Sequence, residues 1–212
     1  MARPLVPLIS VDALVTAALE LVDEAGDFSL PKLAKRIGVS QSSIYNHVSG
    51  REEILELMRG RIISESPYTL HDDQDWEAAL RTIVRSYRDA FARHPRLAPL
   101  LVLQTVQDHQ VLALYENLAV ALQAAGFRGR DVLSAISTID SFALGFALDL
   151  AAPDVVWAPP AVGFPALSSA LDNAAPAEER GEAAFELGLE ILVAGLHSRL
   201  RTTDSPLRTT AQ

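Results

Sequence analysis

Two short helical segments joined by only three residues place the strongest constraint on how this chain folds. The segment LPKLAKRI follows Ser29 and has Pro31 in its first turn, and the segment QSSIYNHV follows Ser40. Serine favours the position before a helix, proline is tolerated in a first turn, and a glycine such as Gly38 favours a helix end. Ala34, four residues before that glycine, is small enough to let the two helices cross closely. The stretch therefore predicts a helix-turn-helix.

Apolar residues recur at helical spacing along most of the remaining chain, in alanine- and leucine-rich runs. With 49% apolar and 21% charged residues, the composition is that of a globular protein. The sequence predicts an all-α fold with an N-terminal three-helix helix-turn-helix domain and a C-terminal helical domain. Ser49 and Glu52 have the spacing of a capping box in front of the next helix. The expected helices span residues 11–25, 30–37, 41–48, 52–64, 76–94, 97–104, 107–125, 131–151, 166–171 and 177–201.

A break at Pro67, followed by polar residues, separates two parts of the chain. We expect one domain over residues 8–66, a second over 67–201 and a disordered tail over 202–212. The most apolar segment is interrupted by Asp140 and is shorter than the roughly 20 residues that cross a bilayer, which predicts a cytoplasmic protein without a membrane partner. The chain has no cysteine, so disulfides, thiolate metal ligands and cysteine nucleophiles are excluded.

Basic charge is concentrated in the helix-turn-helix, although the whole chain has a net charge of −9. Residues 28–51 contain four lysines and arginines and no carboxylate, which suits a surface that meets phosphates. On the second helix, amide side chains such as Gln41 and Asn46 can read base edges, whereas hydroxyl and basic side chains suit phosphate oxygens. The predicted DNA-binding residues are Ser29, Lys32, Gln41, Ser42, Ser43, Tyr45, Asn46, His47 and Arg51.

The stretch LAKRIGVSQSSIYNHVSGREEIL, preceded by AALELVDEAG, resembles the DNA-binding domain of TetR family transcriptional regulators. A weaker likeness in HPRLAPLL, LQAAGF, IDSFALGFAL and FELGLEILVAGL extends the resemblance over about residues 8–200, toward the group that includes the tetracycline repressor. The family implies a homodimeric repressor that releases its double-stranded DNA operator when a small molecule occupies the C-terminal domain. A two-fold dimer in turn implies a near-palindromic operator.

The resemblance also assigns roles to single residues. The positions at which family members contact DNA correspond here to Gln41, Ser42, Ser43, Tyr45, His47 and Arg51. The sequence departs from the tetracycline repressor at Asn46, where that repressor has tryptophan, and at Ser42, where it has proline, so the operator sequence does not follow from that repressor's. Two alternatives stay open: His47 could pack against the following helix, and Tyr45 could lie half in the core.

Aromatic and polar side chains of the second half are candidates for an effector site. Gln104, His109, Asp140 and Ser141 interrupt apolar helices, where each would cost roughly 1–3 kcal/mol if buried without a partner. They either bond within the core or orient a bound, largely hydrophobic molecule. The predicted ligand-binding residues are Tyr87, Phe91, Gln104, His109, Tyr115, Phe142 and Trp157.

Glycines recur every seven residues in the last helix, at Gly181, Gly188 and Gly195. Glycine costs about 1 kcal/mol relative to alanine inside a helix, so close approach of another helix is expected there. The family places its dimer interface, a four-helix bundle, on this helix and on the one over residues 131–151. The predicted interface residues are Ala135, Ser141, Gly145, Gly188, Ile191 and Gly195. The alternative is that the glycines make room for a bulky neighbour in the same subunit.

Other functional classes have little support in the sequence. No two histidines lie one helical turn apart, so we predict neither a metal site nor a cofactor. No serine elbow or buried carboxylate pair is present, which argues against an enzyme. Two alternatives remain: a DNA-binding dimer without small-molecule input, and a helical protein that docks a partner protein.

Overall fold

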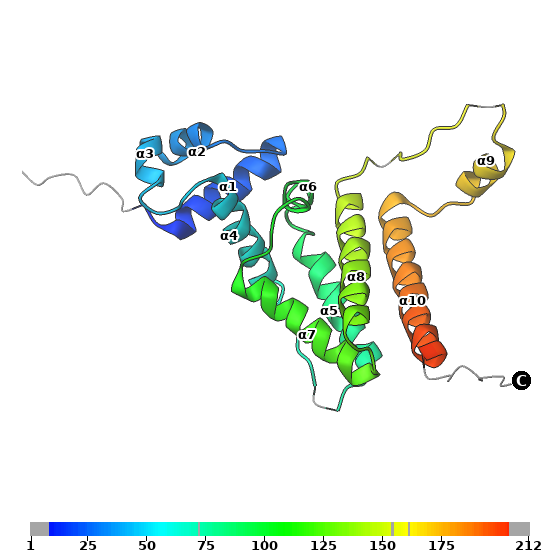
Figure 1. The fold of residues 1–212 in the computed structure, drawn as a ribbon. Coiled ribbons are helices and arrows are strands. Elements are labelled where there is room, and N and C mark those ends of the chain that lie inside the picture. The colour runs from blue at the N-terminus through cyan, green and yellow to red at the C-terminus, as the bar shows by residue number, and fades with distance from the viewer. Residues whose placement is uncertain (1–8, 72, 154, 161, 204–212) are drawn as a thin grey trace, which may run out of the picture.

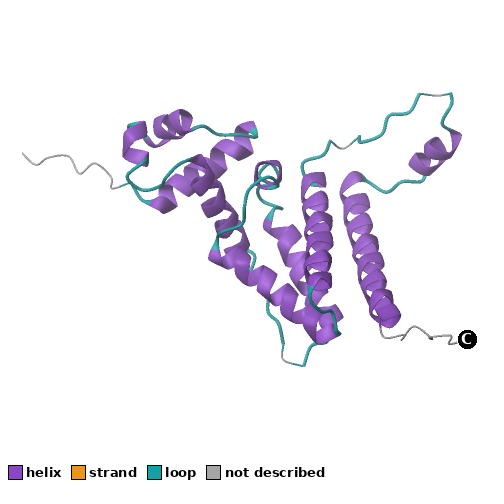
Figure 2. Ribbon diagram, viewed as in Figure 1, coloured by secondary structure: helices purple, strands orange, loops and turns teal. Residues whose placement is uncertain are grey.

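The computed structural model describes residues 9–71, 73–153, 155–160 and 162–203 of the 212-residue chain. This part of the chain consists of helices and loops and contains no strand, which confirms the predicted all-α fold (Figure 2). The helices are α1 (Val11–Ala25), α2 (Leu30–Ile37), α3 (Gln41–Ile44), α4 (Arg51–Ser64), α5 (Trp76–Ala90), α6 (Ala98–Leu101), α7 (His109–Ala125), α8 (Arg130–Asp149), α9 (Pro165–Asp172) and α10 (Ala177–Thr203). The predicted tail lies outside the described residues from 204 onward.

The first two helices begin and end where their capping residues indicate. The side chain of Ser10 accepts a hydrogen bond from the backbone N–H of Ala13 at 3.1 Å. Gly26 and Gly38 end α1 and α2 with φ angles of 76° and 75°, in the left-handed region that favours glycine. Ala34 is buried at the crossing of these helices, as predicted.

The segment after the turn differs from the prediction. The α-helix stops at Ile44, and the backbone N–H of His47 bonds to the Ile44 carbonyl at 2.9 Å in a tighter turn. The predicted capping box between Ser49 and Glu52 is wrong. The next helix starts only after Gly50, so it is the Glu53 carboxylate that accepts the Ser49 N–H, at 2.6 Å.

Three predicted helices of the second half are shorter in the structure. The helix that starts at Trp76 ends at Ala90 rather than at residue 94, and a series of turns leads into the four residues of α6. Asp108 accepts hydrogen bonds from the N–H groups of Gln110 and Val111, so α7 begins one residue after it. Capping by a single carboxylate thus sets this start.

Helix α4 joins the two halves of the molecule (Figure 1). It packs on α1 in the N-terminal half and contacts α5, α6 and α7 in the C-terminal half. There α5, α7 and α8 pack on one another, and α10 stands beside α8. Phe185 of α10 lies between Phe142 and Phe146 of α8, with ring centroids 5.5 and 5.4 Å away. Helix α9 lies out on a long arm and has no buried residue.

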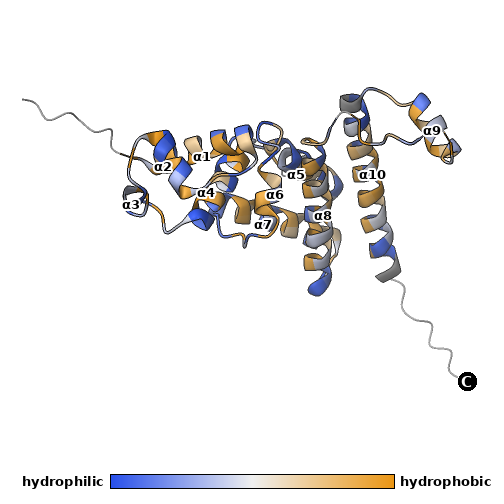
Figure 3. Ribbon diagram, turned by 90° about the horizontal axis from the view of Figure 1, so that it is seen from above, coloured by the Kyte–Doolittle hydropathy of each residue, from blue (hydrophilic) through white to orange (hydrophobic). Residues whose placement is uncertain are grey.

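By length and composition, α8 is apolar enough to cross a membrane. Of its apolar 18-residue stretch, 28% is buried inside the protein. The prediction that Asp140 interrupts the apolar segment is wrong, because α8 continues through Asp140 as one helix of 20 residues. Figure 3 shows hydrophobic residues along both α8 and α10. Because α8 packs on α5, α7 and α10, one of its faces belongs to the core of the bundle, and its other face is exposed.

Candidate functional site

The turn before α3 is held by a cluster of serine hydroxyls. The Ser40 side chain accepts the N–H of Ser43 at 3.2 Å, and its oxygen lies 2.9 and 2.7 Å from the hydroxyls of Ser42 and Ser43. One N–H group at the start of α3 is therefore already used. The contribution of the α3 helix dipole to phosphate binding is small, because α3 is only four residues long.

Polar side chains cover the outer face of the segment after the turn. Ile44 and Val48 are buried and fix its orientation. Tyr45 is 51% exposed, which leaves it half in contact with the protein and half available. His47 is exposed, so the alternative that it packs against the following helix does not hold. The exposed residues Gln41, Ser42, Tyr45, Asn46 and His47 form what we call the recognition face.

Arg51 is tied to its own domain. Its guanidinium pairs with Asp27 at 2.6 Å, donates to the Phe28 carbonyl at 3.3 Å and lies over the Phe28 ring, 5.0 Å from the centroid. The hydrogen bond from Arg51 lowers the pKa of Asp27 below its usual value of 3.8. Asp27 lies just before the basic segment 28–51, so counting charge within that segment missed this partner.

The basic charge of α2 is partly neutralised as well. Arg36 pairs with Glu20 at 3.1 Å and with Glu24, both on α1, and the pKa of Glu24 is lowered by the hydrogen bond from Arg36. Within the described residues, Lys32 and Lys35 are exposed and form no ion pair. The positive charge available to a polyanion therefore comes mainly from these two lysines. Ser29, at the start of α2, is half-buried.

A polar cluster lies in the helical core of the second half. The hydroxyls of Tyr87 and Tyr115 donate to the same Asp140 oxygen, at 3.1 and 2.5 Å. Burial raises the pKa of both phenols above 10.0, and the nearby Asp140 carboxylate adds to the effect. The three side chains satisfy one another, which accounts for a polar group in an otherwise apolar helix.

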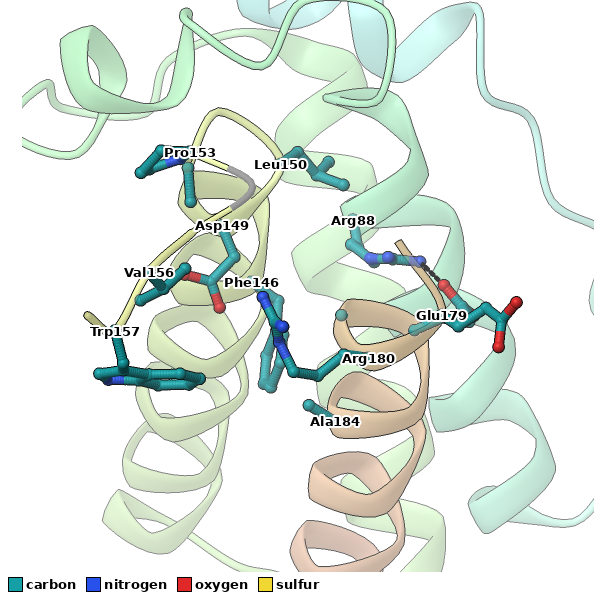
Figure 4. A pocket seen from close by; sticks show the side chains of 13 residues that line it. Arg88, Phe146, Asp149, Leu150, Pro153, Val156, Trp157, Glu179, Arg180 and Ala184 are labelled. Carbon is teal, nitrogen blue, oxygen red and sulfur yellow. Dashed lines mark hydrogen bonds and ion pairs between the residues drawn. The ribbon is translucent and has the colours of Figure 1, made fainter. Parts of the chain in front are cut away.

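A cavity with a volume of about 670 Å³ lies between the end of α8, the loop after it and the start of α10 (Figure 4). Arg88 of α5 closes its far side. Its walls include Phe146, Asp149 and Trp157. Arg180 extends across it from α10 and lies over the Trp157 ring, 5.6 Å from the centroid.

The structure brings three of the seven predicted ligand residues together in the core, where the Tyr87 ring lies 5.9 Å from the ring of Phe91 and 6.4 Å from that of Tyr115. Of the seven, only Trp157 lines this cavity. Phe91 is buried in the core, Phe142 packs on Phe185, and His109 is exposed at the start of α7. Gln104 lines a separate polar cleft beside α4. Periodicity shows that a residue lies on an apolar helix but not which neighbour that helix faces. Asp149 and Arg180 were therefore not predicted as ligand residues, although the proline-rich loop between α8 and α10 brings both to this cavity.

The predicted interface residues divide between two faces. Ser141, Gly145, Ile191 and Gly195 are exposed. Two predictions need correction: Ala135 is only 5% exposed on the core face of α8, and Gly188 faces Phe142 of the same subunit. A Cβ at Gly188 would lie 2.6 Å from the Phe142 ring, so this glycine makes room for a bulky neighbour within the subunit. The exposed face also includes apolar residues that were not predicted, Leu133, Leu148 and Leu187.

No group of three or more histidine and acidic side chains that could hold a metal ion occurs in the described parts of the chain. Beside the recognition face, Arg36 and Arg51 are held in ion pairs, whereas Lys32, Lys35 and His47 are exposed. The arrangement therefore offers a recognition surface at one end and a cavity at the other.

The chain is similar in sequence to known repressors. Residues 69–200, more than half of the chain, match the family described as "Tetracyclin repressor-like, C-terminal domain". The chain is 31% identical over 198 residues to the class D tetracycline repressor protein of Escherichia coli, with 89% of each protein aligned. It spans 60% and 53% of the length of two other curated relatives, both HTH-type transcriptional regulators.

Two solved structures have the same fold. Apo ActR from Streptomyces coelicolor superposes with a TM-score of 0.77 at 23% identity, covering 96% of this chain and 99% of ActR. BioQ in complex with its natural double-stranded DNA operator superposes with a TM-score of 0.67 at 25% identity, covering 89% of this chain and 98% of BioQ. The two-part helical architecture is thus shared with proteins that differ at three quarters or more of the aligned positions.

Proposed function

The chain belongs to the TetR family of transcriptional regulators, and on that premise we propose that it is a repressor that binds a near-palindromic operator as a homodimer. A small, largely hydrophobic molecule releases it from the operator. Members of the family regulate transcription and are not enzymes, in agreement with the prediction from sequence. We place the protein in the cytoplasm, where its operator would lie.

The recognition face carries the DNA-binding part of this proposal. Buried Ile44 and Val48 hold it in one orientation, and it presents amide, hydroxyl and imidazole groups without a carboxylate. Lys32 and Lys35 add positive charge beside it. Amides suit base edges, and lysines suit phosphates. The likeness to BioQ, which was solved with its operator, supports the same use of this domain.

An exposed apolar face on α8 and α10 supports dimerisation. Leu133 is 68% exposed, Leu187 58% and Ile191 64%. Homodimer interfaces are more apolar than the average surface, and a contiguous apolar face of this kind calls for a partner. A second copy joined through this face would present two recognition faces, which would bind two half-sites about one DNA turn apart.

The connections of α4 support control by an effector. Helix α5 contributes Arg88 to the cavity and Tyr87 to the polar core, and it also packs on α4. Because α4 packs on α1, a displacement of α5 changes the position of the DNA-binding half. An effector lowers operator affinity only as far as it binds the arrangement that does not fit DNA more tightly than the arrangement that does.

Fluorescence anisotropy on DNA from upstream of the protein's own gene tests the DNA-binding proposal. We expect tight binding that weakens as salt rises, with a log–log slope of about −0.9 per neutralised phosphate. Gln41→Ala and Tyr45→Ala should weaken binding to this DNA more than binding to random DNA. Leu112→Ala, on the exposed surface of α7, is the control. Absence of binding at low salt on any neighbouring promoter would overturn the proposal.

The polar core favours a second candidate, a DNA-binding dimer without small-molecule input. Tyr87, Tyr115 and Asp140 already satisfy one another, so they need no ligand to offset their burial. A thermal-shift screen separates the two candidates, because an effector that binds the folded state raises the melting temperature. Compounds that raise it and also release DNA favour the ligand-controlled repressor.

A further inference from the structure

The cavity between α8 and α10 has the size and lining of a small-molecule site. Its volume of about 670 Å³ falls within the range of roughly 300–1,000 Å³ that is typical of ligand pockets. Phe146 and Trp157 supply aromatic walls, and Gly181 leaves open space where a side chain would otherwise project. A molecule with aromatic rings would bury them against these walls.

The polar groups of the cavity indicate the charge of its ligand. Arg88 pairs with Glu182 at 2.6 Å and lies over the Phe185 ring, 4.6 Å from the centroid, so its charge is compensated by the protein. Asp149 lies on the same side of the cavity as Trp157 and has no ion pair in the described part of the chain (Figure 4). A carboxylate beside an aromatic face is a favourable environment for a positive charge.

The protein already places a cation in this environment. The Arg180 guanidinium lies over the Trp157 ring and extends into the cavity that Phe146 also lines (Figure 4). Because Arg180 belongs to the first turns of α10 and has a long flexible stem, another cation can replace its guanidinium without moving the helix. The position of the Arg180 head therefore marks where the positive centre of a ligand would lie.

We propose that this cavity binds a hydrophobic aromatic cation, with its rings against Phe146 and Trp157 and its positive centre beside Asp149, in place of the Arg180 guanidinium. Binding itself depends only on these residues. Its regulatory consequence rests on the proposed function: Arg88 of α5 forms the far wall, so occupancy reaches the helix that packs on α4.

Two probes of the same shape and opposite charge test the proposal. Tetraphenylphosphonium and tetraphenylborate are titrated into the full-length protein by isothermal calorimetry. Tryptophan fluorescence is followed in parallel in the Trp76→Phe variant. The chain has two tryptophans, so Trp157 is then the only one that emits. We expect the cation to bind, to change Trp157 emission and to bind at least about tenfold more tightly than the anion.

Two charge variants should change the affinity for the cation in opposite directions. Asp149→Asn should weaken the cation about tenfold, because it removes the carboxylate and keeps the shape. Arg180→Met should strengthen it, because the competing guanidinium is gone. Glu52→Gln, on the exposed start of α4, removes one negative charge far from the cavity and should change neither. Preferential binding of tetraphenylborate, lost in Arg180→Met, would overturn the proposal and assign an anion to the cavity. Cation binding that Asp149→Asn leaves unchanged would overturn it too.

Anisotropy on operator DNA in the presence of tetraphenylphosphonium separates this inference from the proposed function. Binding of the cation with release of DNA supports both. Binding of the cation without any effect on DNA supports the site and contradicts its regulatory role. DNA binding without any binding of the cation overturns the site and leaves the DNA-binding repressor standing.

Discussion

Arg59 of α4 donates a hydrogen bond of 2.8 Å to the backbone carbonyl of Leu101, at the end of α6. Its side chain is 5% exposed and also pairs with Glu56, one turn earlier on α4, at 3.2 Å. Glu56 in turn accepts the backbone N–H groups of Gln107 and Asp108, at 2.8 and 3.2 Å. One buried ion pair on α4 therefore holds both ends of the loop between α6 and α7. Any movement of that loop is transmitted to the helix that carries the DNA-binding half.

Removing one charge of this pair should cost more than removing both. Arg59→Met leaves the Glu56 carboxylate buried without its partner, and we expect a loss of about 3–5 kcal/mol in the free energy of unfolding. The double change Glu56→Gln with Arg59→Met should recover at least about 1 kcal/mol of it. Urea denaturation measures all variants. Arg61→Met on the same helix is the control and should cost under about 1 kcal/mol, because its partners Asp12 and Glu65 are exposed. A double variant less stable than Arg59→Met would contradict the pair's role.

The glycines of α10 should respond oppositely to alanine. Gly188→Ala places a Cβ 2.6 Å from the Phe142 ring, and displacing that ring should cost about 1–3 kcal/mol of stability. Gly195→Ala meets nothing within 4 Å, so the subunit should gain up to about 1 kcal/mol from helix propensity. Thermal unfolding of the two variants at one protein concentration makes the comparison. Equal effects would show that Phe142 moves aside without cost.

The fold followed from sequence where local chemistry decides it. Ser10 acts through its side chain and Gly26 and Gly38 through their own backbone, and the helix ends lie where they predict. The errors lie where distant contacts compete. No residue near Ile44 indicates that the helix stops there. The tighter turn after Ile44 forms because Ile44 and Val48 are both buried against other helices. Gly50 moved the predicted cap by one residue, since it and not Ser49 precedes the helix.

The two sites differ in how far sequence could predict them. The recognition face is one continuous segment, so its exposed residues follow from the periodicity around Ile44 and Val48. The cavity joins the end of α8 to the start of α10 across a long loop, and no local pattern pairs Asp149 with Arg180. Asp140 was singled out as a polar group in an apolar helix and Tyr87 as a ligand-binding residue, but only the structure shows that they bond to each other.

The ion pair between Arg51 and Asp27 makes a prediction for DNA binding. Asp27→Asn removes the carboxylate that holds Arg51 and allows the guanidinium to reach a phosphate, so the salt slope on DNA should steepen by about 0.9. Glu24→Gln, which leaves Arg36 paired with Glu20, changes the net charge equally and serves as the control. Anisotropy at four salt concentrations gives the slopes. Identical slopes for the two variants would mean that overall charge alone acts.

The pair between Glu186 of α10 and Arg85 of α5 predicts a pH dependence of stability. Arg85 donates to both Glu186 oxygens, at 2.7 and 2.6 Å, and this lowers the pKa of Glu186 below 4.5. A carboxyl with a lowered pKa in the folded state stabilises it above the unfolded value, and this contribution is lost as the pH falls through the folded value. Both side chains are about 40% exposed, so screening keeps the contribution under about 1 kcal/mol.

Glu186→Gln should therefore lower the melting temperature by up to about 2–4 °C at pH 7. At a second, acidic pH below 4.5, protonation of the wild-type carboxyl removes its charge as well, so the difference between the two proteins should shrink. Differential scanning calorimetry at both pH values measures it. An equal difference at the two pH values would mean that packing of the side chain, and not its charge, is responsible.

The exposed apolar face of α8 and α10 makes the last prediction, because it links assembly to DNA binding. Ile191 is 64% exposed in the middle of α10, next to open space at Gly195. If this face joins two copies, Ile191→Glu buries an unpaired carboxylate in an apolar interface, and the dimer should dissociate. Sedimentation velocity should then show a monomer with unchanged helix content. Operator affinity should fall toward the non-specific level, because a single recognition face contacts only one half-site. Leu112→Glu, which places the same charge on the exposed face of α7, should leave both properties unchanged. A dimer that persists in Ile191→Glu would place the interface elsewhere, and the apolar face would then need a different partner.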